Sequence, residues 1–475
     1  MREMFYPSPV RRTIRELLDE SAALWPEGIA LRSREQRLTY RALQQAVQQN
    51  ALRLTSAVPA GRVILLSRQR RITLETALSL LTLMYAGRCA VMMPDFATTE
   101  AVAATAARYG ASAIISDAFE QGALPLPVLP LGVLPEGAQA ELLPEVSPED
   151  ECMVLFTSGT TAEPKGAVIT QWNLCADAAG GSRIYPFFPG QRFVNCLPYY
   201  HGYGVLCDVI APLMGGACLC TASEEGLIRD VQHFRPTNIN GVPEVAAVLL
   251  QMLSAFGPEA AGGELRSVLC GGAALDPALG QGLEEFGVGL YNCYGLTEFS
   301  TAIAVNSPRN NDWSSVGLVL PCCEVMIASD GEVLVRGDNM MKGYGPDGPW
   351  LARDVWFHTG DVGSLDTGGR LYISGRKDNV INLPNGEKIQ PEQYEARLKQ
   401  LGGVKEAVVY QPTGRPWLTA VVVPSGDSEA AGAAVAALNA GVSADCRLVG
   451  VRFTAESLVR NALGKIQRRH YRESE

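Results

Sequence analysis

The segment LFTSGTTAEPKG, residues 155–166, combines glycines, hydroxyls and one lysine. Glycine N–H groups and side-chain hydroxyls can donate to phosphate oxygens, and a lysine ammonium adds a compact positive charge. The common P-loop has glycine before its lysine and Ser or Thr after it, whereas Pro164 and Gly166 flank Lys165 here. We therefore predict either a phosphate-binding loop of another kind or an ordinary surface turn. The predicted phosphate ligands are Thr157, Ser158, Gly159, Thr160, Thr161 and Lys165.

Two further polar segments carry residue types that suit a nucleotide. In YNCYGLTE, residues 291–298, the ring of Tyr294 can stack on a base and Thr297 can donate to a phosphate. Glu298 can hold Mg²⁺, which prefers one or two carboxylates together with phosphate oxygens. In HTGDVG, residues 358–363, Asp361 can accept hydrogen bonds from two ribose hydroxyls. The alternatives are a capped strand turn and an Asx-turn.

Two basic segments follow. YISGRKDNVINLPNGEKI, residues 372–389, places Arg376 and Lys377 at a change in composition that suggests a domain joint. VRNALGKIQRR, residues 459–469, places Lys465 beside a glycine. Taken alone, a terminal basic run is usually a solvated tail.

Composition excludes some classes of protein. A chain of 475 residues with 47% hydrophobic and 19% charged residues is expected to form two or more globular domains. Its net charge of −10 argues against a nucleic-acid partner. The start lacks the apolar core of a secretion signal, and the most apolar run, between Glu75 and Arg88, is too short for a membrane span. We read that run as a buried helix and expect a cytoplasmic location.

The 12 cysteines and four histidines lack the spacing of a zinc site. We expect buried free thiols in a reducing compartment.

Apolar patterning predicts the elements that position these segments. Residues 12–150 alternate helical stretches, such as RTIRELLDESAALWP, with short buried strands, RVILLS, CAVMMP and SAIIS. This alternation favours an α/β fold with largely parallel strands. Residues 151–375 continue with strands that end in polar or glycine-rich loops: FVNCLPYYHGYG, PTNINGV, LRSVLCGGAAL and GLYNCYGLTE. Ligands of open α/β sheets bind at such strand ends.

The predicted fold class is α/β, with a large N-terminal domain of layered α/β subdomains and a small α+β C-terminal domain. The large domain spans residues 1–375 and the small one residues 376–475. In the small domain, PEQYEARLKQL is expected to form a helix, and VKEAVVYQ and WLTAVVVPS are expected to form strands.

The five segments, in this order, resemble the adenylate-forming superfamily of acyl- and aryl-CoA ligases, adenylation enzymes and luciferases. The resemblance extends from about residue 12 to residue 470. It implies that a carboxylate attacks the α-phosphorus of ATP to give an acyl-AMP and pyrophosphate. A thiol, of coenzyme A or of a carrier-protein phosphopantetheine, then takes the acyl group. ATP and Mg²⁺ are the implied cofactors.

The resemblance also implies roles for single residues. Residues 158–165 hold the phosphates that leave, Glu298 binds Mg²⁺ and Thr297 contacts phosphate. Lys465 bridges the substrate carboxylate and the α-phosphate, where a positive charge offsets the repulsion between two anions. The remaining implied ATP/AMP contacts are Gly272, Ala273, Asn292, Tyr294, Gly295, Asp361 and Arg376.

Asp378 resembles the family hinge, about which the small domain rotates to remove Lys465 and bring in the strand near Gly386, beside the thiol tunnel. The alternative is a plain linker aspartate. Ala162 departs from the Gly or Ser that is usual in the phosphate loop, and its methyl group restricts φ.

LPYYHGYGV, residues 197–205, resembles the segment that lines the acid pocket, with His201 as a gate. Amino-acid-activating relatives carry an aspartate where this chain has Gly202, and a buried unpaired ammonium would be costly. We therefore expect an uncharged, largely apolar acid, aryl or short-to-medium acyl, with Gly202 leaving room near its carboxyl end. The predicted pocket residues are Tyr200, His201, Gly202, Asn240, Gly271 and Gly295.

Several alternatives stay open. The acceptor is coenzyme A or a discrete carrier protein, the latter typical of secondary-metabolite biosynthesis. Other possible functions are a stand-alone amino-acid adenylation enzyme, a luciferase-type oxidase, and a non-catalytic acyl-AMP-binding relative. A non-catalytic relative would be free to lose Lys465, Glu298 or Asp361, and all three are present.

Overall fold

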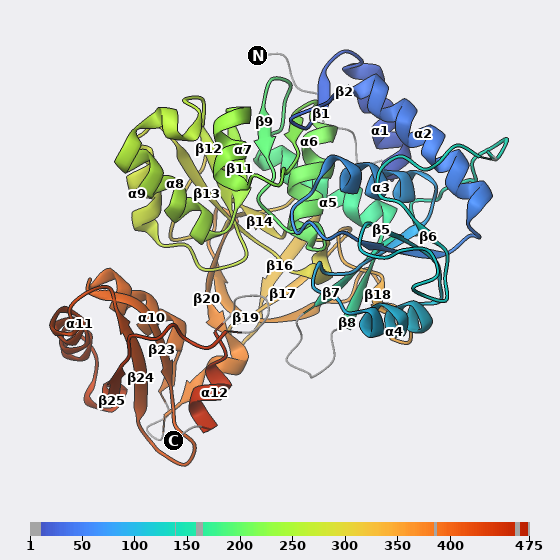
Figure 1. Ribbon diagram of the computed structural model, residues 1–475. Coiled ribbons are helices and arrows are strands. Elements are labelled where there is room, and N and C mark those ends of the chain that lie inside the picture. The colour runs from blue at the N-terminus through green and yellow to red at the C-terminus, as the bar shows by residue number, and fades with distance from the viewer. Residues whose placement is uncertain (1–10, 138, 158–164, 384–386, 461–465, 474–475) are drawn as a thin grey trace. The chain divides into compact units, whose positions relative to one another are not determined.

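The computed structural model describes residues 11–137, 139–157, 165–383, 387–460 and 466–473 (Figure 1). Contacts divide the chain into two compact units. The first comprises Met1–Val325, Val335–Phe357 and Thr367–Leu371. The second comprises Met326–Leu334, His358–Asp366 and Tyr372–Glu475, so it includes two segments that precede residue 376.

One sheet of the first unit has the strand order β18-β8-β7-β4-β3-β5-β6. Its strands are β3 (Arg62–Leu66), β4 (Cys89–Met92), β5 (Ala111–Ser116), β6 (Val128–Leu129), β7 (Glu151–Thr157), β8 (Lys165–Thr170) and β18 (Gly343–Gly345). The pairs β3–β4, β3–β5 and β4–β7 are parallel, as the nearly continuous apolar runs predict. At the other edge, β8 pairs with both β7 and β18 in antiparallel fashion, which the sequence patterns did not predict.

The first four helices are α1 (Ile14–Leu24), α2 (Tyr40–Ala57), α3 (Leu74–Tyr85) and α4 (Thr99–Tyr109). Each follows a threonine whose hydroxyl accepts a hydrogen bond from a first-turn N–H group, which is the favourable N-cap arrangement. Every residue of α3 except Glu75 is buried, which confirms the predicted buried helix.

The first unit contributes a second run of strands, in the order β15-β14-β13-β12-β11-β9-β10-β1-β2. They are β1 (Ile29–Arg32), β2 (Arg37–Thr39), β9 (Arg192–Val194), β10 (Cys218–Cys220), β11 (Asn238–Gly241), β12 (Ser267–Cys270), β13 (Gly289–Tyr294), β14 (Ala304–Val305) and β15 (Gly317–Val319). Pairing is parallel from β1 through β10, β9, β11 and β12 to β13, so the carboxyl ends of β11, β12 and β13 meet at one edge.

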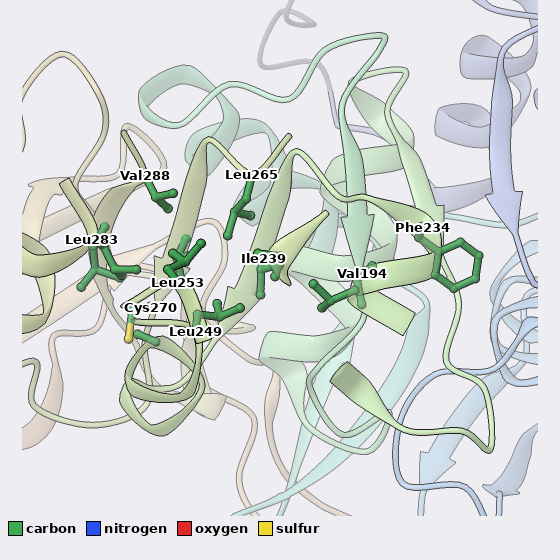
Figure 2. Close-up of a cluster of buried hydrophobic side chains, with 14 of the residues drawn as sticks. Val194, Phe234, Ile239, Leu249, Leu253, Leu265, Cys270, Leu283 and Val288 are labelled. Carbon is green, nitrogen blue, oxygen red and sulfur yellow. The ribbon is translucent and has the colours of Figure 1, made fainter. Parts of the chain in front are cut away.

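The helices that follow in this unit are α5 (Gln171–Ile184), α6 (Ala211–Met214), α7 (Leu227–Phe234), α8 (Pro243–Phe256) and α9 (Pro277–Glu284). Figure 2 shows the buried cluster that α7, α8 and α9 form with the strands. It includes Ile239 from β11, Leu249 and Leu253 from α8, and Leu283 from α9. Each such buried side chain contributes about 1.5–3 kcal/mol through apolar burial. This core holds the strand ends in place.

Residues 193–204, which the sequence predicted as a strand ending in a loop, begin within β9, which ends at Val194, and a π-helix, η1 (Gly204–Ile210), starts at their last residue. Within η1, Asp208 is fully buried and accepts hydrogen bonds from Asn195 and Asn240. Burial raises the pKa of Asp208 to about 7. The π-helix therefore depends on Asn195, just after β9, and on Asn240 of β11, and local patterning does not report these contacts.

The second unit contains an α+β core. Strand β24 (Leu418–Pro424) is antiparallel to β23 (Val404–Tyr410) and parallel to β25 (Leu448–Phe453). The helices of this unit are α10 (Pro391–Gln400), α11 (Ser428–Ala440) and α12 (Arg468–Glu473), and a short pair joins β21 (Ile381–Asn382) to β22 (Lys388–Ile389). The strands β16 (Cys323–Ile327), β17 (Glu332–Gly337), β19 (Phe357–Leu365) and β20 (Arg370–Arg376) precede this core in the chain. Among the helices of the described ranges, none is long and apolar enough to cross a membrane.

Candidate active site

The structure describes both ends of the predicted phosphate loop. Thr157 lies opposite Lys165 in the β7–β8 pair, and the Thr157 hydroxyl donates to the Lys165 carbonyl over 3.3 Å. The loop therefore connects two antiparallel strands, unlike a P-loop, which leads from a strand into a helix. Lys165 is exposed. The predicted residues Ser158, Gly159, Thr160 and Thr161, together with Ala162, lie outside the described residues.

Tyr344 links the phosphate-loop lysine to the predicted magnesium ligand. Its ring centroid lies 5.5 Å from the Lys165 ammonium, and its hydroxyl donates to Glu298 Oε1 over 2.6 Å. Burial and the neighbouring Glu298 charge raise the pKa of Tyr344, so its hydroxyl stays protonated and can donate. The sequence analysis missed Tyr344, because a tyrosine between two glycines is also typical of an ordinary turn.

The segment 291–298 spans the end of β13 and the turn that follows it. The strand ends at Tyr294, and a short 3₁₀ helix, η3 (Thr297–Phe299), follows. A Cβ at Gly295 would lie 1.6 Å from the Thr301 carbonyl oxygen, so glycine is required there. The Glu298 carbonyl accepts from Met341 N over 2.7 Å, which fixes the backbone beside the carboxylate.

The adjacent strand β12 leads into Gly271, Gly272 and Ala273. Gly272 has φ of +83°, a conformation that favours glycine. A Cβ at Gly271 would lie 2.6 Å from Cys293 Sγ, so this glycine permits close approach to β13. Asn292 is buried, and its amide donates to the Ser315 carbonyl. The predicted adenine neighbours thus sit on two adjoining strand ends.

The predicted acid-pocket residues have different environments. Tyr200 packs edge-on against Tyr199 and Phe96, with ring centroids 5.3 and 6.3 Å away, and burial raises the pKa of Tyr200 to about 12. His201 is exposed, and its Nδ1 accepts from the Tyr203 N–H group over 3.2 Å. The space expected beside Gly202 is filled, because a Cβ there would lie 2.6 Å from Thr301 Oγ1.

Asn240 is fully buried, and its amide nitrogen donates to the Cys207 carbonyl and to Asp208 Oδ1 over 2.7 and 2.9 Å. These bonds support the π-helix. Asn240 Oδ1 is buried and has no hydrogen-bond partner among the described residues.

In the second unit, the two predicted ribose contacts lie together. Arg376 Nη1 donates to Asp361 Oδ1 over 3.0 Å and to the Thr359 carbonyl over 2.8 Å. Asp361 is buried. The guanidinium thereby orients a carboxylate that can accept hydrogen bonds from vicinal hydroxyls.

Glu332 fixes the turn that carries Asp361, and the sequence analysis did not identify it. Its side chain is 4% exposed, and it accepts from the Gly360 N–H group, from His358 Nδ1 and from Lys377 Nζ over 3.0, 3.0 and 2.7 Å. Burial alone would raise the pKa of Glu332, but these three hydrogen bonds, the one from Lys377 first, outweigh it and lower the pKa. The segment DGEV otherwise looks like a plain turn and strand.

Asp378 lies in the short 3₁₀ helix η4 (Lys377–Asn379), is exposed, and has its Oδ2 3.8 Å from Arg376 Nη2. The predicted catalytic Lys465 and the predicted tunnel residue Gly386 lie outside the described residues.

In the first unit the donor set suits phosphate and Mg²⁺, because Lys165 and Tyr344 lie on the adjoining strands β8 and β18 and the Tyr344 hydroxyl contacts the Glu298 carboxylate. In the second unit, taken by itself, the Asp361–Arg376 pair suits ribose hydroxyls. The sequence profile of the AMP-binding enzyme family matches residues 18–345. This chain belongs to the family of AMP-binding enzymes.

Curated relatives and solved structures extend the match. The 2-succinylbenzoate–CoA ligase of Bacillus cereus is 28% identical over 435 residues, which cover 87% of this chain and 89% of that protein. The oxalate–CoA ligase of Arabidopsis thaliana is 28% identical over 68% of this chain and 67% of its own. The structure of o-succinylbenzoate CoA synthetase from Bacillus subtilis, in complex with its acyl-adenylate intermediate, has a TM-score of 0.81 and 24% identity. It covers 97% of this chain and 98% of its own.

These matches confirm the predicted resemblance and the predicted fold class. They also confirm the class of enzyme, an AMP-forming acid–thiol ligase.

Proposed function

We propose that this protein activates a monocarboxylic acid with an uncharged, largely apolar tail, aryl or short-to-medium acyl, and transfers it to coenzyme A. The observation that carries the proposal is the Lys165–Tyr344–Glu298 arrangement. It sets a positive charge for a leaving pyrophosphate beside a carboxylate that suits Mg²⁺.

In the first step, a carboxylate oxygen of the acid bonds to the α-phosphorus of ATP while the bond to pyrophosphate breaks. Lys165 and the loop hydroxyls bind the leaving phosphates, Glu298 holds Mg²⁺, and Thr297 donates to phosphate. Asp361 and Arg376 bind the ribose. Lys465 offsets the repulsion between the two reacting anions.

In the second step, the thiol sulfur bonds to the acyl carbon, AMP leaves, and the thiol proton is released to solvent. We propose that residues 376–475 rotate about Asp378 between the steps, which removes Lys465 and brings in the strand near Gly386.

The surroundings of Tyr200 support an apolar tail, because the rings of Tyr199 and Phe96 pack edge-on against it. Because relatives are named for 2-succinylbenzoate and oxalate, diacids are the discriminating comparison.

Coenzyme A is the proposed acceptor, since the matched relatives are named as CoA ligases. A discrete carrier protein with phosphopantetheine is the alternative. A cytoplasmic location is proposed because all 12 cysteines are free thiols, which a reducing compartment preserves.

The test is pyrophosphate release with ATP, Mg²⁺ and a panel of aryl, fatty, amino and dicarboxylic acids, each with and without coenzyme A. We expect release with aryl or short-to-medium acyl acids, multiple turnovers only with coenzyme A, and loss of release in Lys465→Ala. A preference for diacids would overturn the proposed tail. Multiple turnovers with a phosphopantetheinylated carrier protein and not with coenzyme A would overturn the proposed acceptor.

A further inference from the structure

A cavity of about 500 Å³ opens in the first unit and is lined by residues of β9, β1 and β2. Figure 1 shows these strands in the ribbon. Three arginines line the cavity, Arg32, Arg37 and Arg192, together with Cys218 and the apolar groups of Trp25 and Pro189. Among the described residues predicted for ATP or acid binding, none lines this cavity. Its volume falls in the range that small-molecule sites occupy, roughly 300–1,000 Å³.

The strand register gathers the arginines on one face of the sheet. Arg32 of β1 is paired with Arg37 of β2 and with Cys220 of β10, and Cys218 is paired with Arg192 of β9. Residues at paired positions point to the same face. The three guanidinium groups and the two thiols therefore share that face.

Two of these arginines are electrostatically uncompensated. Arg192 is paired with Glu264 over 2.6 Å, but Arg32 and Arg37 have no carboxylate within 4 Å in the described part of the chain. Like charges directly opposite on antiparallel strands are destabilising, so the pair Arg32–Arg37 by itself costs stability. A bound anion would offset that cost.

Neighbouring groups do not neutralise the cavity. Arg32 lies over the ring of Phe234, 5.4 Å from its centroid, and Figure 2 shows Phe234 at one end of the buried cluster. This packing holds the guanidinium without removing its charge. The acidic residue that lines the cavity, Glu27, forms an exposed ion pair with Arg41 over 3.2 Å, so three arginines face one glutamate in the lining.

The positive charges of the arginines affect the thiol of Cys218, which lines the cavity. A hydrogen bond from Cys220 lowers the pKa of the Cys218 thiol, and the charges of Arg32, Arg192 and Arg37 lower it further, against the effect of burial. Cys218 therefore serves as a reporter for charge bound in the cavity.

We propose that this cavity is a second ligand site that binds a small organic anion, a carboxylate or phosphate ester with a flat apolar body. The anionic oxygens bridge Arg32 and Arg37, whose planar guanidinium groups suit two-pronged recognition of either group. The apolar body lies against Trp25 and Pro189.

The first test is calorimetric titration of the full chain with phenyl phosphate and with phthalate, in the presence of ATP and Mg²⁺ so that the nucleotide site is filled. Saturable binding of either probe is expected, and the probe that binds identifies the anionic group. Arg32→Gln and Arg37→Gln should each weaken binding about tenfold, since each removes charge-assisted hydrogen bonds. Arg37 is exposed, so its variant is expected to fold normally.

The matched control is Arg229→Gln, which removes one exposed positive charge from α7 outside the cavity and should bind both probes like the parent protein. Binding of neither probe would overturn the proposal. Equal affinity in the parent and in both cavity variants would also overturn it, by placing the ligand elsewhere.

The second test locates the ligand. Iodoacetamide alkylates a thiolate by forming a sulfur–carbon bond and releasing iodide, and peptide mass spectrometry follows each cysteine separately. A bound probe should slow alkylation of Cys218 and leave the partly exposed Cys196 unchanged. Equal effects on both thiols would contradict the proposed location. Pyrophosphate release by Arg37→Gln should match the parent, which separates this site from the proposed reaction.

Discussion

Glu298 in the first unit and Glu332 in the second are both held by neighbouring donors, but the charge of those donors differs. Tyr344, a neutral phenol, donates to Glu298. Glu332 is almost fully buried and receives hydrogen bonds from Lys377, His358 and a backbone N–H group. Glu298 is oriented by a neutral donor, so its negative charge can act on a metal ion. The negative charge of Glu332 is instead balanced by Lys377 within the fold.

The largest expected effect comes from Glu298→Gln. The amide keeps an oxygen for the Tyr344 hydroxyl but removes the charge proposed for Mg²⁺. Losing such a preorganised group should lower kcat for pyrophosphate release about 10²–10³-fold. The Mg²⁺ concentration that gives half-maximal activity should be higher than in the parent. An unchanged kcat would assign Glu298 a structural role.

The next expected effect comes from Glu332→Gln, which leaves Lys377 without its buried anionic partner and loosens the turn that carries Asp361. Hydrogen bonds to charged groups contribute about 1.5–3 kcal/mol, so KM for ATP should rise roughly tenfold or more, with a smaller change in kcat.

Its matched control is Asp330→Asn. Asp330 also contacts Lys377, over 2.7 Å, but is exposed, and KM should change little because exposed ion pairs contribute little. If the two variants behave alike, the burial of Glu332 is not what matters.

Tyr344→Phe should have a moderate effect. It keeps the ring beside Lys165 and the Glu298 charge and removes only the hydroxyl that orients the carboxylate, so kcat should fall about fewfold to tenfold. Tyr344→Leu also removes the ring and should lose more. Steady-state kinetics of the two variants distinguish the effect of orienting the Glu298 carboxylate from the effect of packing the Tyr344 ring against Lys165.

The smallest expected effect is a pH dependence of stability. Because the folded-state pKa of Glu332 is lowered, its contribution is complete above the unfolded-state value, near 4.5, and is lost as pH falls through the folded-state value. The midpoint temperature of thermal unfolding should therefore fall less steeply between pH 7 and pH 3 in Glu332→Gln than in the parent. Parallel curves for the two proteins would contradict this role.

The same contrast explains what the sequence could predict. Buried elements such as α3, β3 and β12 follow from apolar runs, and Glu298 lies within a segment whose residue types suit a nucleotide. Glu332 occurs in an ordinary turn sequence, and its role arises from partners 26 and 45 residues away. The spacing of apolar residues indicates which positions are buried but not which residues they contact. It therefore identified neither the hydrogen bonds of Glu332 nor the antiparallel pairing of β8.

The π-helix illustrates the same limit. Its buried Asp208 is held by Asn195, 13 residues earlier, and by Asn240, 32 residues later. The sequence analysis predicted only the strand and loop over residues 193–204, which precede the π-helix. Likewise, the room expected beside Gly202 is occupied by Thr301, a contact that no local pattern reports.

The most direct test of the central claim is a single turnover without thiol, quenched and analysed by mass spectrometry, using the acid that the panel selects. The account predicts acyl-AMP and pyrophosphate in equal amounts, close to one equivalent per enzyme, and disappearance of the acyl-AMP when coenzyme A is added. ADP and phosphate in place of AMP products, or an acyl-AMP that persists with coenzyme A and with a phosphopantetheine carrier, would contradict it.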